Sequence, residues 1–513
     1  MRRWTALLLT LVLALGLTAC GEPVALPTVT PTPEVTTPPV EEQIFALGYD
    51  PNHTLHPITG ESQANLELAS LVYEGLFELN NDFEAAPVLA KSAEADESGL
   101  VWTISVREDV VFSDGTPLTA AHVVSSLKLA RKSGFYAARL AEVASVKEKN
   151  GAVVITLTAP NGALPALLDI PVVLEQATAP PEDAPPLGTG RYRYMTGENV
   201  LCLMANSNRA GWENLPWLTI PLRPVESADR RVNAFDSGEI SAVSADFTAA
   251  YTLGYSCSYE VCDYPTTNLI YVGFQTEKGP CQSAEVRKAC SMAFHREELV
   301  SSLLASRGDA SCLPVHPNHE SYDADPGRLT ADPEGALELL LNAGYKRKDD
   351  GLLYQGRTPM TLTIAVNRDG GAKVDMAQAL EDSLSALGVT VMVKNLIWTD
   401  YLKALETGEF DLYIGEIRMT GDFDVTQLLT GTLNYGKWVS EEAPALLAEW
   451  KAAQGENRTA AASRLWEVLA EEAPIAPLCF KRDSLLVRWG MVSGLSPTRG
   501  DLFHEMESWH PVK

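Results

Sequence analysis

The sequence predicts an α/β protein of two or three lobes, carried behind a leader and a spacer. Strand-like and helix-like segments alternate through "LTIAVN", "AKVDMAQALEDSLSAL", "VTVMVKNLIW", "TDYLKALETGEF" and "DLYIGEIR", which is typical of a sheet with helices packed on it. The composition, 46% hydrophobic and 21% charged, is ordinary for a globular protein. A chain of 513 residues is long enough to fold as more than one lobe.

The N-terminus predicts a lipoprotein leader. "MRRW" supplies positive charge and "TALLLTLVLALGL" follows as an apolar run that is shorter than the roughly 20 residues of a membrane-spanning helix. The run ends in "LTAC", which resembles the lipobox of bacterial lipoproteins, so residues 1–20 are expected to be a signal peptide and Cys20 the lipidated residue. The alternative is an ordinary signal peptide in which Cys20 is incidental.

Residues 21–42 read "GEPVALPTVTPTPEVTTPPVEE", a Pro- and Thr-rich composition that predicts an extended, semi-stiff linker. No second apolar run is long enough to cross a bilayer. The sequence therefore predicts an extracytoplasmic protein held at a bacterial cell membrane by its lipid alone.

The charge excludes one class of partner. Forty basic residues against 67 acidic ones give a formal charge of −27, which would repel phosphate backbones and argues against nucleic-acid binding.

Seven cysteines remain beside Cys20, an odd number that cannot all pair within the chain; they are Cys202, Cys257, Cys262, Cys281, Cys290, Cys312 and Cys479. No C-x-x-C pair occurs, so zinc-ribbon and thioredoxin-type sites lack their central feature. Cys257 and Cys262 are the expected local disulfide, and small buried thiols are the alternative.

The first half of the body reads as scaffold. "NLELASLVYEGLFEL" predicts a buried helix that ends by Gly75, and "LVWTISV" alternates as a strand does. In "VVFSDGTPLTAAHVV", Asp114 and Gly115 form a turn and Thr119 caps the next helix. Every polar residue of this stretch then has a structural role.

Ser125 and Lys128 match the S-x-x-K pattern of a serine nucleophile with a lysine base. The S-D-N and K-T-G motifs that accompany it are missing from the chain. We therefore expect no enzyme activity and no cofactor.

Several blocks together resemble the bacterial extracellular solute-binding proteins of family 5, the peptide- and nickel-type receptors of ABC importers. They are "LVYEGLFEL", "PVLAKSAEADESGLVWTISVREDVVFSDGTPLTAAHVVSSLK", "GTGRYRY", "NLIYVGFQTEKGPCQSAEVRKACSMAFHREELVSSLL" and "DPEGALELLLNAGY". His295 and Arg296 stand where the family has an Asp-Arg pair, and Asp332 and Gly344 begin and end the following helix. The resemblance covers almost everything from about Glu42 onward.

The resemblance implies a two-lobed, periplasmic-binding-protein-like α/β fold of the cluster C type. Lobe I would comprise residues 43–268 with an extra subdomain at roughly 85–185, lobe II residues 269–475, and residues 476–513 would return to lobe I. The chain would cross between the lobes at Thr266 to Phe274 and at Glu472 to Leu485. A monomer would capture a short peptide between its lobes, and an ABC permease would recognise the closed form.

The resemblance also implies a ligand segment, because peptide receptors of this family bind the peptide as an extended strand and meet its ammonium with an aspartate. The corresponding stretch is "DLYIGEIRMTGDFDVTQLLTG", in which Asp422 is the first candidate and Asp424 the second. It departs from the family's Gly-Trp, because Glu416 follows Gly415. The alternative for both aspartates is a helix cap or a solvated side chain.

Three weaker candidates and one cation complete the predicted ligand set. Arg418 could bind a ligand carboxylate or pair internally, and Trp398, Asn434 and Tyr435 could line the cleft or belong to the core.

Two other functions stay open. A nickel chelate or other small solute is the runner-up, with Cys312, His316, His319 and Glu320 as metal donors in "SCLPVHPNHESYD". His53 and His56 show the same H-x-x-H spacing elsewhere, so no metal site is predicted. The more distant alternative is a surface enzyme or interaction protein.

Overall fold

The computed structural model describes residues 44–175, 184–197, 200–249, 254–322 and 329–512. The predicted signal peptide, Cys20 and the linker at 21–42 lie outside these ranges. No helix among the described residues is long and apolar enough to cross a membrane.

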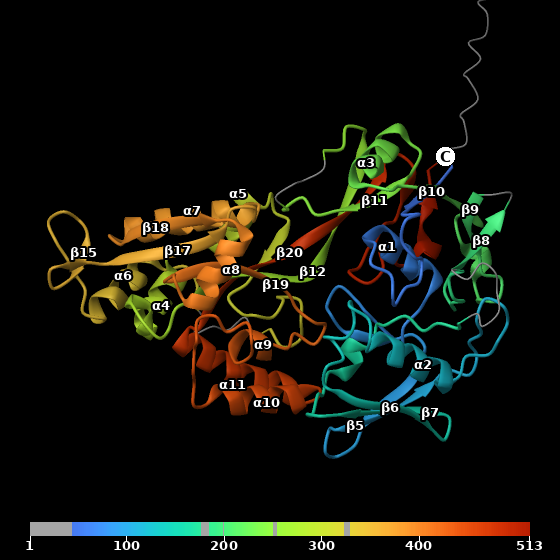
Figure 1. Cartoon of the computed structure of the whole chain (residues 1–513), viewed down its shortest axis with the longest axis horizontal. Coiled ribbons are helices and arrows are strands. Elements are labelled where there is room, and N and C mark those ends of the chain that lie inside the picture. Colours follow the sequence, from blue (N-terminus) through green and yellow to red (C-terminus); the bar gives the residue numbers. More distant parts are fainter. Residues whose placement is uncertain (1–43, 176–183, 198–199, 250–253, 323–328, 513) are drawn as a thin grey trace, which may run out of the picture. The chain divides into compact units, whose positions relative to one another are not determined.

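A seven-stranded mixed sheet is the centre of the described chain. Its strand order is β11-β20-β12-β19-β17-β18, and β13 also pairs with β20. The strands are β11 (Ala242–Ala245), β12 (Tyr259–Phe274), β13 (Gly308–Ala310), β17 (Thr361–Asn367), β18 (Thr390–Leu396), β19 (Leu412–Arg418) and β20 (Ile475–Arg488). β12 and β20 are antiparallel, and their register shifts between Pro265 and Leu269. These two long strands connect the helices around β17 with those around α1 (Figure 1).

We call lobe I the part of the chain formed by the described residues before β12 together with the C-terminal residues after β20. Its sheet has the order β1-β10-β9-β8. Its elements are β1 (Leu47–Tyr49), α1 (Gln63–Val72), β2 (Phe77–Leu79), β3 (Ala85–Pro87), β8 (Tyr192–Gly197), β9 (Val200–Ala205), η2 (Trp212–Asn214), β10 (Thr219–Pro224), α3 (Ala228–Ser237), β21 (Val492–Ser493), η4 (Met506–Ser508) and β22 (His510–Pro511). Phe45 packs between Trp217 and Trp509, so the C-terminal segment shares the core of the N-terminal one.

A subdomain extends lobe I. Its antiparallel sheet has the order β4-β5-β7-β6, and it comprises β4 (Ala90–Ala95), β5 (Val101–Val106), α2 (Ala120–Ala130), β6 (Val143–Lys149), β7 (Ala152–Leu157) and η1 (Leu164–Leu167). Before α2, the Asp114 carboxylate accepts from the backbone N–H of Thr116 at 2.8 Å, and Thr119 and His122 form a capping box. Ser125 and Lys128 are exposed on α2.

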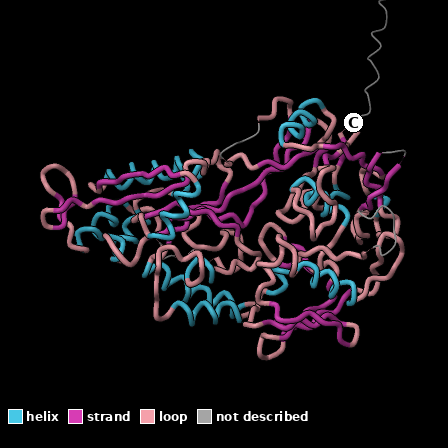
Figure 2. Tube along the Cα trace, viewed as in Figure 1, coloured by secondary structure: helices cyan, strands magenta, loops and turns pink. Residues whose placement is uncertain are grey.

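Lobe II carries helices on both faces of the central sheet (Figure 2). They are η3 (Pro280–Gln282), α4 (Ala284–Met292), α5 (Arg296–Leu303), α6 (Pro333–Asn342), α7 (Ala372–Ala386), α8 (Trp398–Thr407), α9 (Thr426–Leu429), α10 (Ala443–Ala452) and α11 (Glu456–Glu472), with a hairpin of β14 (Lys346–Arg347), β15 (Leu353–Gln355) and β16 (Thr358–Pro359). Side chains of β12 alternate between the faces. Ile270 and Val272 join the core with α4 and α7, whereas Leu269 and Tyr271 join the core with α10 and α11.

The expected disulfide between Cys257 and Cys262 is not formed. Cys262 lies in the extended strand β12 and its Sγ is 3.7 Å from the carbonyl of Leu495. Cys257 precedes that strand, and its Sγ is 3.8 Å from the carbonyl of Phe235. The extended backbone carries the two thiols to different neighbours, and all seven described cysteines are free.

Candidate ligand pocket

A cavity of about 470 Å³ opens where α1, the crossing strands and the C-terminal segment meet. Its volume is within the range of ligand pockets, about 300–1,000 Å³. Polar residues from distant parts of the chain line it, namely Glu67, Ser70, Glu74, Glu78, Arg107, Arg139, Asp169, Arg191, Arg209, Tyr264, Thr266, Asn268, Arg418, Asp483, Arg499 and Asp501.

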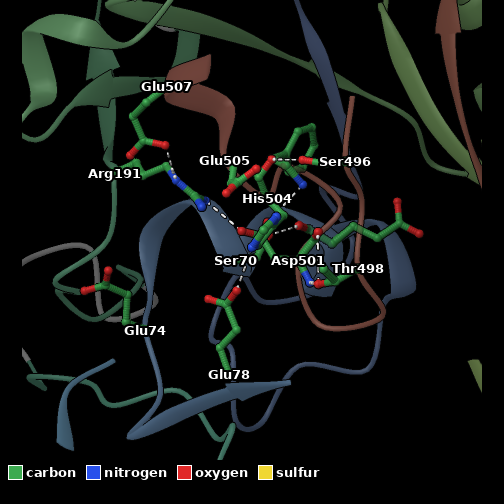
Figure 3. A network of polar contacts seen from close by, with 12 residues as sticks. Ser70, Glu74, Glu78, Arg191, Ser496, Thr498, Asp501, His504, Glu505 and Glu507 are labelled. Atoms are coloured by element: carbon green, nitrogen blue, oxygen red, sulfur yellow. Dashed lines mark hydrogen bonds and ion pairs between the residues drawn. The ribbon is translucent and has the colours of Figure 1, made fainter. Parts of the chain in front are cut away.

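One side of this pocket carries a network of ion pairs, in which Arg191 Nε and His504 Nδ1 have no hydrogen-bond partner among the described residues. Arg191 donates to Asp501 at 2.8 Å and lies 3.3 Å from Glu507. His504 Nε2 lies 3.0 Å from Glu78, and the hydrogen bond to Glu78 raises the pKa of His504. Figure 3 shows Arg191 directed towards Asp501 and Glu507, and His504 towards Glu78. Because these side chains pair with one another, we expect this side of the pocket to be rigid.

A second side concentrates positive charge. The Asp169 carboxylate is shared by Arg139 and by Arg499, whose Nη2 is 3.1 Å away. Burial lowers the pKa of Arg499, and the neighbouring charges of Arg139 and Arg418 lower it further. The buried Arg499 Nε has no hydrogen-bond partner among the described residues. One carboxylate therefore faces more positive charge than it neutralises.

Among the described residues, Arg418 is the cation of this pocket that forms no salt bridge. It lies at the end of β19, and its Nε donates to the Asn268 side-chain oxygen at 3.1 Å. It takes part in none of the salt bridges found between described residues. Guanidinium groups bind carboxylates well, so Arg418 is available to an anionic group.

Asp483 is the matching unpaired acid. It lies in β20, its carboxylate accepts no hydrogen bond from any described residue, and its Oδ1 is buried. Burial, followed by the charge of Asp246, raises the pKa of Asp483 to about 6, although Lys481 and Arg418 act in the opposite direction. A partly buried carboxylate without donors is costly for the protein alone. An ammonium group in the pocket would supply the missing donors.

The model of the bacterial extracellular solute-binding proteins, family 5 Middle, matches residues 84–438. The chain belongs to this family. It is 21% identical over 479 residues to the oligopeptide-binding protein AppA of Bacillus subtilis (strain 168), covering 88% of each chain. It is 27% identical over 356 residues to the glutathione-binding protein GsiB of Salmonella typhimurium (strain LT2), covering 66% of this chain and 67% of GsiB.

Among solved structures, the unliganded open form of the periplasmic murein tripeptide-binding protein MppA superposes with a TM-score of 0.75 at 19% identity, covering 92% of this chain and 98% of MppA. The expected two-lobed, periplasmic-binding-protein-like fold is thereby confirmed. Family 5 members are extracytoplasmic solute-binding proteins of ABC importers, and the relatives are binding proteins rather than enzymes.

The two aspartates of the predicted ligand segment lie outside the pocket lining. Asp422 is buried, and its carboxylate accepts from Asn161 Nδ2 at 2.9 Å. Asp424 accepts from the backbone N–H of Thr426 at 2.9 Å and from Lys451 Nζ at 2.8 Å. In this structure both carboxylates are occupied by protein donors.

Apart from Arg418, the other predicted ligand residues also lie outside the pocket lining. Glu416 pairs with Lys373 and Lys481, and Gly415 lies against the ring of Tyr271. Trp398 is exposed, the Asn434 side chain bonds the backbone of Trp438, and Tyr435 packs on Tyr413. Of the eight predicted residues, Arg418 lines the pocket.

The two candidate histidine donors interact with other parts of the protein. His316 Nε2 lies 3.2 Å from Asp309, and its Nδ1 accepts from the backbone of Asn318. Burial lowers the pKa of His319 to about 3, and its Nδ1 accepts from the backbone of Ser321. No group of three His, Cys, Asp or Glu side chains suited to a metal occurs among the described residues.

The sequence reading missed Asp483 and Arg499. The available signal for Asp483 was its position in "LCFKRDSLLV", where a short polar stretch interrupts an apolar crossing strand and its acid needs a partner. Arg499 lies in "SPTRGD", which resembles any surface turn, so no local pattern marks it.

Proposed function

We propose that this family 5 protein is a lipid-anchored receptor that captures short peptides with free termini and delivers them to an ABC permease. The observation that carries the proposal is the pair of unmatched groups in one pocket, the acid Asp483 and the cation Arg418. A free peptide carries one ammonium and one carboxylate. Relatives that are named as binding proteins for oligopeptides, glutathione and a murein tripeptide support this class of ligand.

In this proposal Asp483 accepts hydrogen bonds from the ligand ammonium, and Arg418 donates to the ligand carboxylate with help from the free Nε of Arg499. Backbone and hydroxyl groups near Thr266 orient the peptide between them. Asp422 remains the alternative ammonium partner, but it would first have to release Asn161.

Ligand binding favours the closed state, because the proposed contacts come from both sides of the cleft. Arg499 follows the C-terminal return to lobe I, whereas Arg418 ends a strand of lobe II. A ligand that bridges them stabilises only the arrangement in which both reach it. The monomer would present that closed form to the permease while Cys20 anchors it to the membrane.

A thermal-shift screen tests the proposal. Protein lacking residues 1–40 is mixed with peptides of two to five residues, their N-acetylated and C-amidated forms, and nickel with and without histidine. Ligand at 100 times its dissociation constant adds about 2.7 kcal/mol of stability. We expect free peptides to raise the melting temperature and both blocked forms to lose most of this effect.

Two variants then test which aspartate binds the ligand ammonium. Asp483→Asn should remove the response to free peptides, whereas Asp422→Asn is the matched control that should keep it. Retention by Asp483→Asn with loss in Asp422→Asn would move the ammonium site to Asp422. Stabilisation by nickel mixtures alone would refute the peptide proposal.

A further inference from the structure

Two glycines allow lobe I and lobe II to approach each other closely beside the subdomain. Gly421 lies between β19 and α9 in lobe II. A Cβ atom added to it would lie 2.5 Å from the backbone oxygen of Ala166 and 2.6 Å from Leu79 Cδ1, both in lobe I. Real Cβ atoms essentially never come within 3.0 Å of such neighbours, so this contact requires a residue without a side chain.

Gly162 makes the reverse contact, from the subdomain of lobe I to lobe II. It precedes η1, and a Cβ atom added to it would overlap the backbone oxygen of Ala453 and lie 2.6 Å from the carbonyl carbon of that residue. Its backbone N–H donates to the carbonyl of Lys451 at 2.6 Å. Neither Gly162 nor Gly421 has a positive φ, so the local backbone accepts alanine at both positions. The nearest atoms to either added Cβ all belong to the opposite lobe.

Phe83 places a lobe I side chain in the core of lobe II. It lies in the turn between β2 and β3, but its ring is 3% exposed and belongs to the core with α10 and α11. The ring centroid is 4.7 Å from that of His316 and 5.0 Å from that of Phe423. The Asn80 side-chain oxygen accepts from the backbone N–H of Glu84 at 2.9 Å, so the turn is shaped by its own residues. It presents the ring to lobe II as a preformed element.

We propose that Gly162, Gly421 and Phe83 form a closure seam, which is already populated in the empty receptor and sets how far the lobes can close. The seam rests on the opening and closing of the lobes that the proposed function requires, but its formation needs no ligand. None of the three residues belongs to the pocket lining found among the described residues. A ligand adds its own contacts to an arrangement that the seam already favours.

The seam lets closure be changed without disturbing the core of either lobe. In the docked arrangement, Gly421→Ala places a methyl group against the backbone oxygen of Ala166, which cannot turn aside as the tip of a flexible side chain can. Parting of the lobes removes the clash, because the nearest atoms all lie in the opposite lobe. The substitution therefore selects the open state.

Scattering and hydrogen exchange of the empty protein test the seam. Protein lacking residues 1–40 contains the whole compact unit that begins at Ile44, and it is refolded from denaturant so that it carries no ligand. We expect Gly421→Ala, Gly162→Ala and Phe83→Ala each to increase the radius of gyration. In Phe83→Ala, the amide of Gly162 should exchange at least about tenfold faster than in the wild type, because its hydrogen bond to lobe II opens together with the rest of the seam.

Gly134 supplies the matched control. It lies in the subdomain, and a Cβ atom added to it would meet no atom within 4 Å, so Gly134→Ala should scatter and exchange as the wild type does. Wild-type scattering by all three seam variants would overturn the proposal. Loss of folded structure in a glycine variant of the seam, measured by circular dichroism, would also overturn it, since parting of the lobes would then not relieve the clash.

The outcome is independent of the peptide screen, because no ligand is added. Seam variants that behave as the wild type refute the seam and leave the receptor proposal to the screen. A screen without any stabilising peptide refutes the receptor proposal, and the scattering of the variants still decides whether the seam holds the lobes together.

Discussion

At the residue scale, Asp483 is the most informative group of the pocket. The folded protein places a carboxylate in β20, leaves it without a hydrogen-bond donor and raises its pKa to about 6. Binding sites often keep groups that are unfavourable for the empty protein. The cost of Asp483 therefore has a simple explanation if a cationic group of the ligand meets it.

The raised pKa predicts that Asp483→Asn stabilises the empty protein at neutral pH. A carboxyl whose pKa is higher in the folded state favours folding below its ordinary value of 3.8, and this contribution is lost as pH rises through about 6. At pH 7 ionised Asp483 costs about 1–3 kcal/mol. Urea unfolding should show a gain for Asp483→Asn at pH 7 and a smaller gain at pH 4.5.

The exposed Asp349 offers a matched control, since Asp349→Asn should change the free energy of unfolding by less than about 0.5 kcal/mol at both pH values. Equal stability of Asp483→Asn and the wild type at pH 7 would contradict the partly buried, unpaired state of this carboxylate.

At the element scale, local rules predicted the helices better than the contacts between distant segments. Asp332 accepts from the backbone N–H of Gly335 at 2.9 Å at the start of α6, as expected for a cap. The helix predicted to end by Gly75 ends at Val72, and β2 begins at Phe77. The apolar pattern of "NLELASLVYEGLFEL" therefore covers both a helix and a strand. The expected Cys257–Cys262 disulfide is not formed, because the extended backbone of a strand separates residues that are close in sequence.

The loop before α9 and the end of α10 form a bridge between lobe II and the subdomain of lobe I. Lys451 Nζ lies 2.8 Å from Asp424 and 2.7 Å from Glu142, which precedes β6. The backbone carbonyl of Lys451 accepts from the N–H of Gly162 at 2.6 Å. Lys451 is itself buried, so its charge depends on these two carboxylates.

The bridge predicts that Lys451→Met is destabilising. The change retains an unbranched chain but leaves two carboxylates without their shared cation. Because both carboxylates are partly solvated, we expect a loss of about 1–3 kcal/mol, below the cost of breaking a fully buried pair. Chemical denaturation measures it, and Lys128→Met on the exposed face of α2 should be nearly neutral. An equal effect of both substitutions would show that the bridge contributes nothing.

At the scale of the whole molecule, the pocket forms where segments that are distant in the sequence come together in the fold. Its polar walls come from α1, the subdomain, both crossing strands, β19 and the C-terminal return. Sequence reasoning could assign the family fold from consecutive blocks and could name Arg418, which lies in a recognisable segment. It could not join Asp483 and Arg499 to that segment, because the three residues meet only after the chain has crossed between the lobes.

The same topology predicts compaction on binding. If a peptide contacts Arg418 and Arg499 together, it should favour the closed arrangement and reduce the radius of gyration measured by small-angle X-ray scattering. An N-acetylated peptide should leave the radius unchanged, as should a free peptide added to Asp483→Asn. Saturation by a stabilising peptide without any decrease would argue for a receptor that does not close.

Both ends of the described chain are held in lobe I. The backbone N–H of Ala46 donates to Ser241 Oγ at 3.0 Å, and Phe45 packs against Trp509 near the C-terminus. A tether entering through Ile44 would therefore be attached to lobe I, so that closure would appear as a movement of lobe II relative to the tethered lobe. An orientation-sensitive probe on exposed Trp398 of α8 would then register the swing more strongly than one placed near Val512.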